Sequence, residues 1–172
     1  MKHYSWESSF LEIFETCIER YRAGSKNPDE LYMPDEMAFI SSIGYKPREF
    51  FDFIEDHVEE GEPSPITALL IASVRRDYFI SQQESQPSSH EITTDDLPPR
   101  DAEIEGIRWL PRIITKARAK LRGELHPNIM YACGGDRNFL KQHDIHPADF
   151  LRFIWGAGES DEKIAAYVRQ SG

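Results

Sequence analysis

The sequence predicts an all-α protein built from two pseudo-symmetric repeats of about four helices each. Apolar residues recur at the three- to four-residue spacing of amphipathic helices, and no segment alternates as a strand would. Residues 39–54 also match residues 139–154 at a shift of 100 positions, with five identities in sixteen. The identical pairs are Phe39 and Phe139, Pro47 and Pro147, Phe50 and Phe150, Phe53 and Phe153, and Ile54 and Ile154. A duplicated helical unit follows from this spacing, and we expect the two units to pack as an intramolecular dimer.

The similarity continues upstream at a shift of 99 positions. The matching pairs are Gly24 and Gly123, Pro28 and Pro127, and Tyr32 and Tyr131. We therefore divide the chain into a first helical repeat over residues 1–82, an acidic Ser/Thr/Pro linker over residues 83–106, and a second helical repeat over residues 107–172.

Four helices are expected in the first repeat. The first covers residues 8–23 and ends at Gly24, and a short helix follows over residues 35–42. Pro47 opens the third helix, because proline is favoured at the first helical position. The fourth helix runs to residue 81 and should be central, since apolar residues cover most of its surface. Those residues are Ile66, Leu69, Leu70, Ile71 and Val74.

Residues 84–106 break the helical pattern and are expected to form a mobile, partly extended linker. The second repeat then follows the plan of the first. We expect a helix over residues 109–122, a short helix over 136–142, a third that begins at Pro147, and a last one capped by Ser160.

Composition indicates an ordinary soluble protein. The chain has 172 residues, of which 40% are hydrophobic and 29% charged, and its longest apolar run is half the length of a membrane span. No secretory signal is evident near the N-terminus. Cys17 and Cys133 are too few for a disulfide framework and are interpreted as reduced thiols. We expect a cytoplasmic location and no cofactor.

The charge is distributed unevenly. The net charge of −10 comprises −8 in residues 1–82, −6 in residues 83–106 and +4 in residues 107–172. Either the acidic and basic halves complement one another, or the basic half meets an external polyanion. Binding to nucleic acid is not expected of a protein with this net charge.

The second half resembles a known bacterial family. The segments that carry the resemblance are Ile107-Arg108-Trp109-Leu110-Pro111-Arg112, Lys116 to Leu121 with Gly123, Asp136 to Phe139, and Ile145-His146-Pro147 to Phe150. Over residues 107–168 the chain is similar to the domain of unknown function family 5069, a family of small helical proteins. The resemblance implies a helical fold and no particular activity.

A basic helix is the first candidate binding site. Arg112, Lys116 and Lys120 lie in one row at a spacing of four residues, which could hold phosphates or another anion. Trp109 at the start of this helix could stack on a base or belong to the core. The alternative for the row is a solvated face, or a face neutralised by acidic residues of the first repeat. Those acidic residues are Glu12, Glu15 and Glu19.

The loop before Asp136 is the second candidate. Gly134 and Gly135 could form an anion-binding turn at a helix N-terminus, and Cys133 could act as a thiol there, paired with His126. The alternative is a flexible loop in which Asp136 caps the helix and Cys133 fills space.

His143 and His146 have a spacing that metal ligands sometimes use. A zinc site needs three or four ligands, and His146 could instead cap the helix that begins at Pro147. We expect no metal.

The sequence thus favours a non-catalytic interaction or small-ligand-binding module, with an unknown protein or a small anion as partner. The alternative is a small thiol- or metal-dependent enzyme built on Cys133 and the nearby histidines. Association with a membrane is not expected, and homo-oligomerisation is left open.

Overall fold

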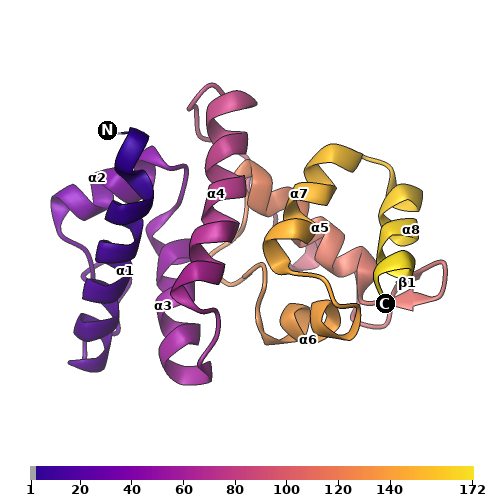
Figure 1. Ribbon diagram of the computed structural model, residues 1–172, viewed down its shortest axis with the longest axis horizontal. Helices are drawn as coiled ribbons and strands as arrows, with labels where there is room; N and C mark the ends of the chain where they lie inside the picture. Colours follow the sequence, from indigo (N-terminus) through magenta and orange to yellow (C-terminus); the bar gives the residue numbers. More distant parts are fainter. Residues whose placement is uncertain (1–2) are drawn as a thin grey trace. The chain divides into compact units, whose positions relative to one another are not determined.

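The computed structural model describes residues 3–172 and is mostly helical (Figure 1). The all-α class predicted from the sequence is confirmed. The chain divides into two compact units, Met1–Gln86 and Pro87–Gly172. None of the helices in the described residues is both long and apolar enough to cross a membrane.

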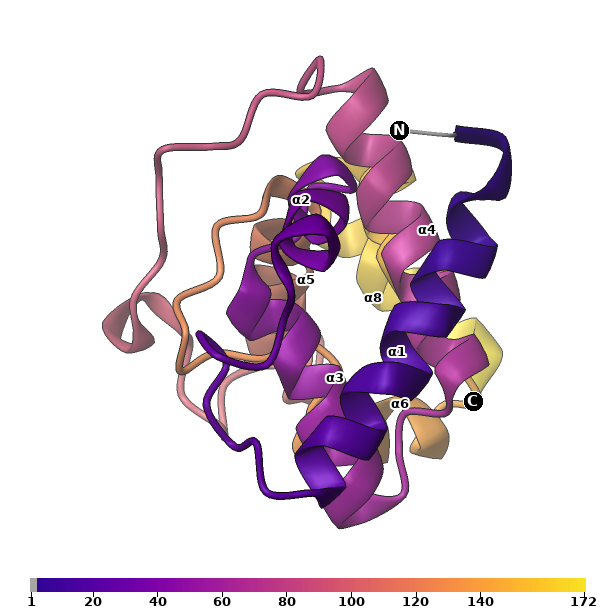
Figure 2. The same ribbon diagram turned by 90° about the vertical axis from the view of Figure 1, so that its left-hand side faces the viewer.

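The first unit contains a short 3-10 helix and four α-helices. Their bounds are η1 (His3–Ser5), α1 (Trp6–Arg22), α2 (Pro34–Ser42), α3 (Pro47–Glu60) and α4 (Pro65–Ser81). Helix α1 packs on α3 and α4, and α2 packs on α3 (Figure 2). Pro47 opens α3 as predicted, and the Ser64 hydroxyl accepts a hydrogen bond from the Thr67 amide at the start of α4.

An aromatic cluster fills the core of this unit. Phe10 and Phe14 of α1 meet Phe50 of α3, with ring centroids 5.1 and 6.1 Å apart, and all three side chains are fully buried. Two apolar residues that were expected to wrap α4, Ile66 and Leu70, are instead exposed. Burying one face of α4 against α1 leaves these two positions on the other side of the helix.

The second unit repeats the helical order after an irregular segment. Its elements are η2 (Thr94–Asp96), β1 (Glu103–Ile104), β2 (Ile107–Arg108), α5 (Leu110–Arg122), α6 (Gly134–Gln142), α7 (Pro147–Ala157) and α8 (Asp161–Ser171). Helix α7 packs on both α5 and α8. The predicted helix ends lie within two residues of the observed ones.

The segment predicted to be a mobile linker has defined structure. β1 and β2 form an antiparallel pair, with Glu103 opposite Arg108. The connection is Glu105-Gly106, both with positive φ, as the type I′ turn of a two-residue hairpin requires. The expectation of a chain without strands was wrong here, because two-residue strands are too short to show an alternating pattern.

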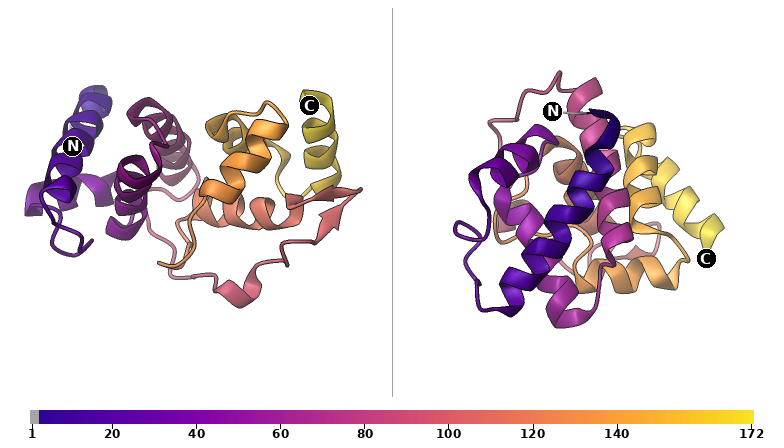
Figure 3. Two further views of the ribbon diagram at one scale, coloured as in Figure 1. Left: turned by 90° about the horizontal axis from the view of Figure 1, so that it is seen from below. Right: turned by 60° about the vertical axis from the view of Figure 1, so that its left-hand side comes forward.

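This segment is attached to the helices of the second unit. It passes below α5 in Figure 3 (left) before it reaches β1. The Ile92 amide donates to the Glu124 carbonyl at 2.8 Å, and the Ser88 hydroxyl donates to the Glu124 carboxylate at 2.8 Å. Leu97 is buried. Residues 87–106 are therefore part of the second unit.

The two units share one hydrogen bond at corresponding positions. The Tyr32 hydroxyl donates to the Pro47 carbonyl at 2.9 Å, and the Tyr131 hydroxyl donates to the Pro147 carbonyl at 2.7 Å. In each unit this bond joins the loop after the first helix to the start of the third. The matching tyrosines and prolines thus make the same bond in each unit, and the packing of two pseudo-symmetric repeats as an intramolecular dimer stays a prediction.

Candidate functional site

A pocket of about 340 Å³ lies beside α5 in the second unit. Its walls come from the segment around η2, the first half of α5, the loop over residues 128–133 and the start of α6. The lining residues are Thr94, Leu97, Arg100, Trp109, Arg112, Lys116, Asn128, Ile129, Met130, Cys133 and Gly135. Five of the seven residues proposed from the sequence therefore line one pocket: Trp109, Arg112, Lys116, Cys133 and Gly135.

Trp109 is fixed at the entrance to α5. It occupies the left-handed region with φ 71°, which costs a residue with a side chain of the order of 1 kcal/mol. Its backbone amide donates to the Ala102 carbonyl at 3.2 Å, and its indole Nε1 donates to Asp136 Oδ1 at 2.9 Å. Gly135 lies so close that a Cβ there would be 2.7 Å from Trp109 Cζ2. These contacts hold the indole in one orientation.

Asp136 is the polar centre of the site and is fully buried. Its carboxylate accepts from Lys116 Nζ at 3.0 Å and from the Ala132 amide at 3.0 Å, in addition to the Trp109 indole. It was proposed as the cap of its helix, but the N-cap is Cys133. Asp136 instead reaches back from the first turn of α6 and joins this helix to α5.

Lys116 is buried together with Asp136. Side-chain exposure is 6% for Lys116 and 0% for Asp136, so water screens this ion pair little. The Lys116 ammonium also lies 3.2 Å from Cys133 Sγ. The charge of Lys116 is therefore balanced by Asp136, and its ammonium group is held in one position at the pocket wall.

The first unit also has an ion pair between its first and second helices, with the carboxylate at the corresponding position. Arg20 of α1 pairs with Glu36 of α2, and Glu36 lies 100 positions before Asp136. This pair is more exposed, at 31% for Arg20 and 13% for Glu36. Both units thus have an ion pair that joins their first helix to their second, but only in the second unit is the pair almost completely buried.

Arg112 and Arg100 supply positive charge that no carboxylate neutralises. Arg112 donates from Nη1 to the Pro98 carbonyl at 2.8 Å and lies over the Trp109 ring, 5.9 Å from its centroid. Arg100 is exposed, and its guanidinium makes no hydrogen bond or ion pair with any residue in 3–172. Among the described residues that line the pocket there is no Asp or Glu.

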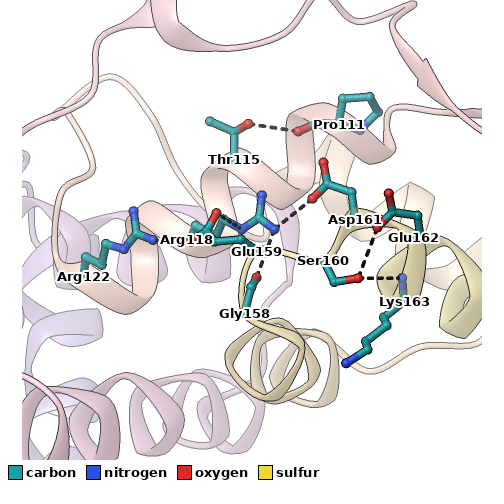
Figure 4. A network of polar contacts seen from close by, with 10 residues as sticks. All are labelled: Pro111, Thr115, Arg118, Arg122, Gly158, Glu159, Ser160, Asp161, Glu162 and Lys163. Carbon is teal, nitrogen blue, oxygen red and sulfur yellow. Dashed lines mark hydrogen bonds and ion pairs between the residues drawn. The ribbon is translucent and has the colours of Figure 1, made fainter.

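The other half of α5 is neutralised by the turn between α7 and α8 (Figure 4). Arg118 donates to the Gly158 carbonyl at 3.0 Å and to Asp161 at 2.8 Å, and Arg122 pairs with Glu159 at 2.9 Å. These two arginines are therefore neutralised inside the second unit, by acidic residues of the last helix and its preceding turn. The expected neutralisation by Glu12, Glu15 and Glu19 of the first repeat stays a prediction.

Two proposed residues do not line the pocket. Lys120 is buried on α5 with 2% exposure, and Gly134 begins α6 outside the lining. The row of three basic residues on α5 therefore contributes two of its members, Arg112 and Lys116. Lys120 is separated from them by its position one turn further along the helix.

The histidines make their contacts elsewhere. His126 Nδ1 accepts from the Asn128 amide, and His146 Nδ1 accepts from the Ala148 amide. His146 thus caps α7, as one interpretation of the sequence proposed. His143 packs on Phe139, with ring centroids 4.7 Å apart. Within residues 3–172, no three His, Cys, Asp or Glu side chains come together to hold a metal ion.

Sequence reasoning missed several parts of this pocket. Arg100 and Leu97 lie in the segment interpreted as a linker, and no local pattern marks them as neighbours of α5. Ile129 and Met130 were passed over as loop residues. The role of Asp136 had a usable signal, because the internal repeat aligns it with Glu36.

Comparison with known proteins gives one family match, which covers every residue of the pocket lining except Thr94. Residues 97–172 match the family described as Domain of unknown function (DUF5069). The resemblance inferred from the sequence is confirmed, and the match starts ten residues earlier than expected, so that it includes Leu97 and Arg100. No curated protein and no solved structure matches the chain.

Proposed function

We propose, taking the DUF5069 match of residues 97–172 as the premise, that the second unit binds a small anionic ligand in the pocket beside α5. The single observation that carries this proposal is the contrast along that helix. Arg118 and Arg122 are paired with carboxylates, whereas Arg112 and the neighbouring Arg100 face the pocket without one.

Charge-assisted hydrogen bonds from guanidinium groups are strong and directional, and they suit phosphate and carboxylate groups. Arg112 is already oriented by its bond to the Pro98 carbonyl, so little side-chain freedom is lost when it meets a ligand. A pocket of this volume suits a small molecule. These features support a binding module that needs no catalytic group.

The experiment is a titration of the full-length protein with inorganic phosphate at low ionic strength, followed by nuclear magnetic resonance. We expect saturable shifts of the Trp109 indole signal and of amides in residues 128–135. The affinity should fall as salt is added, since exposed charges are screened.

Two variants with equal loss of charge separate a site from general attraction. Arg100→Gln removes a pocket guanidinium that the protein itself does not use, and should weaken phosphate binding by about three- to tenfold. Arg122→Gln removes a charge from the same unit outside the pocket and should leave the affinity within about twofold. Equal weakening in both variants, or shifts that do not saturate, would refute the proposal.

A further inference from the structure

The pocket is only partly polar, and this constrains what can fill it. Beyond the cations, its wall contains Leu97, Ile129 and Met130, of which the first two are buried. An inorganic anion would leave the apolar surface of the half-buried Met130 and Trp109 facing water. A ligand that carries an apolar body as well as a charge would cover it and gain from its burial.

Trp109 determines the character of that apolar wall. Its one polar atom, Nε1, already donates to Asp136, so the ring presents only carbon and π surface to a ligand. Asp136 and Gly135 fix the ring from one side, and the indole lies half-buried at the pocket. The Arg112 guanidinium and the Lys116 ammonium lie over part of this ring, each 5.9 Å from its centroid. A rigid, half-buried aromatic ring with exposed surface beside these cations can pack against another planar ring.

We propose that the ligand is an aromatic ring bearing an anionic group, with the ring against Trp109 and the anion at Arg100 and Arg112. This inference rests on the proposed function and names the chemical class of its ligand. Different side chains would contact the ligand's charge and the ligand's ring, so each part of the proposal can be tested separately.

The test compares three probes that carry the same anionic group: inorganic phosphate, cyclohexyl phosphate and phenyl phosphate. Binding to the full-length protein is measured by calorimetry. Phenyl phosphate should bind about five- to tenfold more tightly than inorganic phosphate, which corresponds to one aromatic contact with the burial that accompanies it. Cyclohexyl phosphate should fall between the two.

Trp109→Leu should remove the preference for phenyl over cyclohexyl phosphate, and this ratio is the readout because both probes carry the same anionic group. Because this change also removes the bond to Asp136, a second measurement uses the unaltered protein. Phenyl phosphate should shift the ring signals of Trp109 through its ring current, whereas cyclohexyl phosphate should not. Trp6 and Trp155 serve as internal controls for this effect.

The possible outcomes separate the two proposals. If inorganic phosphate binds but phenyl phosphate binds no better, the ligand class is wrong and the anion site stands. If cyclohexyl and phenyl phosphate bind equally, the pocket accepts apolar anions without aromatic preference, and the assignment to Trp109 is overturned. If none of the three binds, both proposals fail.

Discussion

Replacing Asp136 by asparagine tests the central interaction of the site. The substitution keeps the shape of the side chain but removes the negative charge that balances Lys116. In the native protein the carboxylate accepts from three donors, namely the Lys116 ammonium, the Trp109 indole and the Ala132 amide. The side-chain oxygen of an asparagine can still accept some of these hydrogen bonds. Its NH₂ group cannot accept one, so at least one of the three donors is left facing another donor.

The expected cost follows from the burial of the pair. Lys116 is 6% exposed and Asp136 is not exposed, so the remaining ammonium cannot turn to solvent. Breaking a buried ion pair by removing one partner costs about 3–5 kcal/mol. We therefore expect Asp136→Asn to lower the free energy of unfolding of the second unit by about 4 kcal/mol.

Glu36→Gln provides the matched control in the first unit. Its partner Arg20 is 31% exposed, so the guanidinium can be hydrated after the change. The expected cost is about 1 kcal/mol or less. The comparison thus sets a buried ion pair against a more exposed one, each of which joins the first helix of its unit to the second.

Urea denaturation of the full-length protein measures both effects. The indole signals of Trp109 and Trp155 report on the second unit, and that of Trp6 reports on the first. A double variant, Lys116→Met with Asp136→Asn, should regain part of the loss because no buried charge is left unbalanced. A cost for Asp136→Asn no larger than that for Glu36→Gln would refute the argument from burial.

Three further predictions follow from the same contacts. Gly135→Ala should destabilise the protein by about 1–3 kcal/mol in urea denaturation, because the new Cβ would clash with the Trp109 ring. Gly134→Ala should be neutral or stabilising, because a Cβ there would meet only one atom, at 3.8 Å. The opposite order of stabilities would contradict this packing argument. Cys133, which lines the pocket, should react with a thiol reagent in the native protein, whereas the buried Cys17 should react only on unfolding. Mass spectrometry of the labelled peptides measures the order of reaction, and earlier labelling of Cys17 would contradict the prediction. Burial raises the pKa of the Cys17 thiol to about 12 from an ordinary value of 9.0. The protonated thiol therefore contributes its full stabilisation below pH 9, and this contribution is lost as the pH rises toward 12, at up to about 1.4 kcal/mol per pH unit. A Cys17→Ala protein should lack this part of the alkaline loss of stability, and identical stability–pH profiles of the two proteins would contradict the prediction.

Much of the helical framework could be predicted from the sequence. Pro47 and Pro147 define the start of the third helix in each unit, because proline at the first helical position needs no amide partner. The repeat also identified Tyr32 and Tyr131 as equivalent before their bonds were known. Local residue chemistry and periodicity suffice for features of this kind.

The pocket was predictable only in part, for a physical reason. Trp109 and Lys116 lie on one helix, so their proximity follows from helical geometry. Arg100 reaches the same pocket through an irregular segment whose path depends on single contacts such as Arg112 with the Pro98 carbonyl. Ile66 and Leu70 illustrate the opposite error, because apolar character alone did not decide which side of α4 would be buried.

The bond between the Ile92 amide and the Glu124 carbonyl has a practical consequence for anyone who divides this protein. A fragment cut at residue 107, where the helical pattern resumes, would lack Leu97 and Arg100 and would leave the end of α5 without this partner. A fragment that starts at Pro87 keeps the whole pocket wall on one polypeptide. The natural boundary for dissecting the chain therefore lies at Pro87, some twenty residues before the first helix of the second unit.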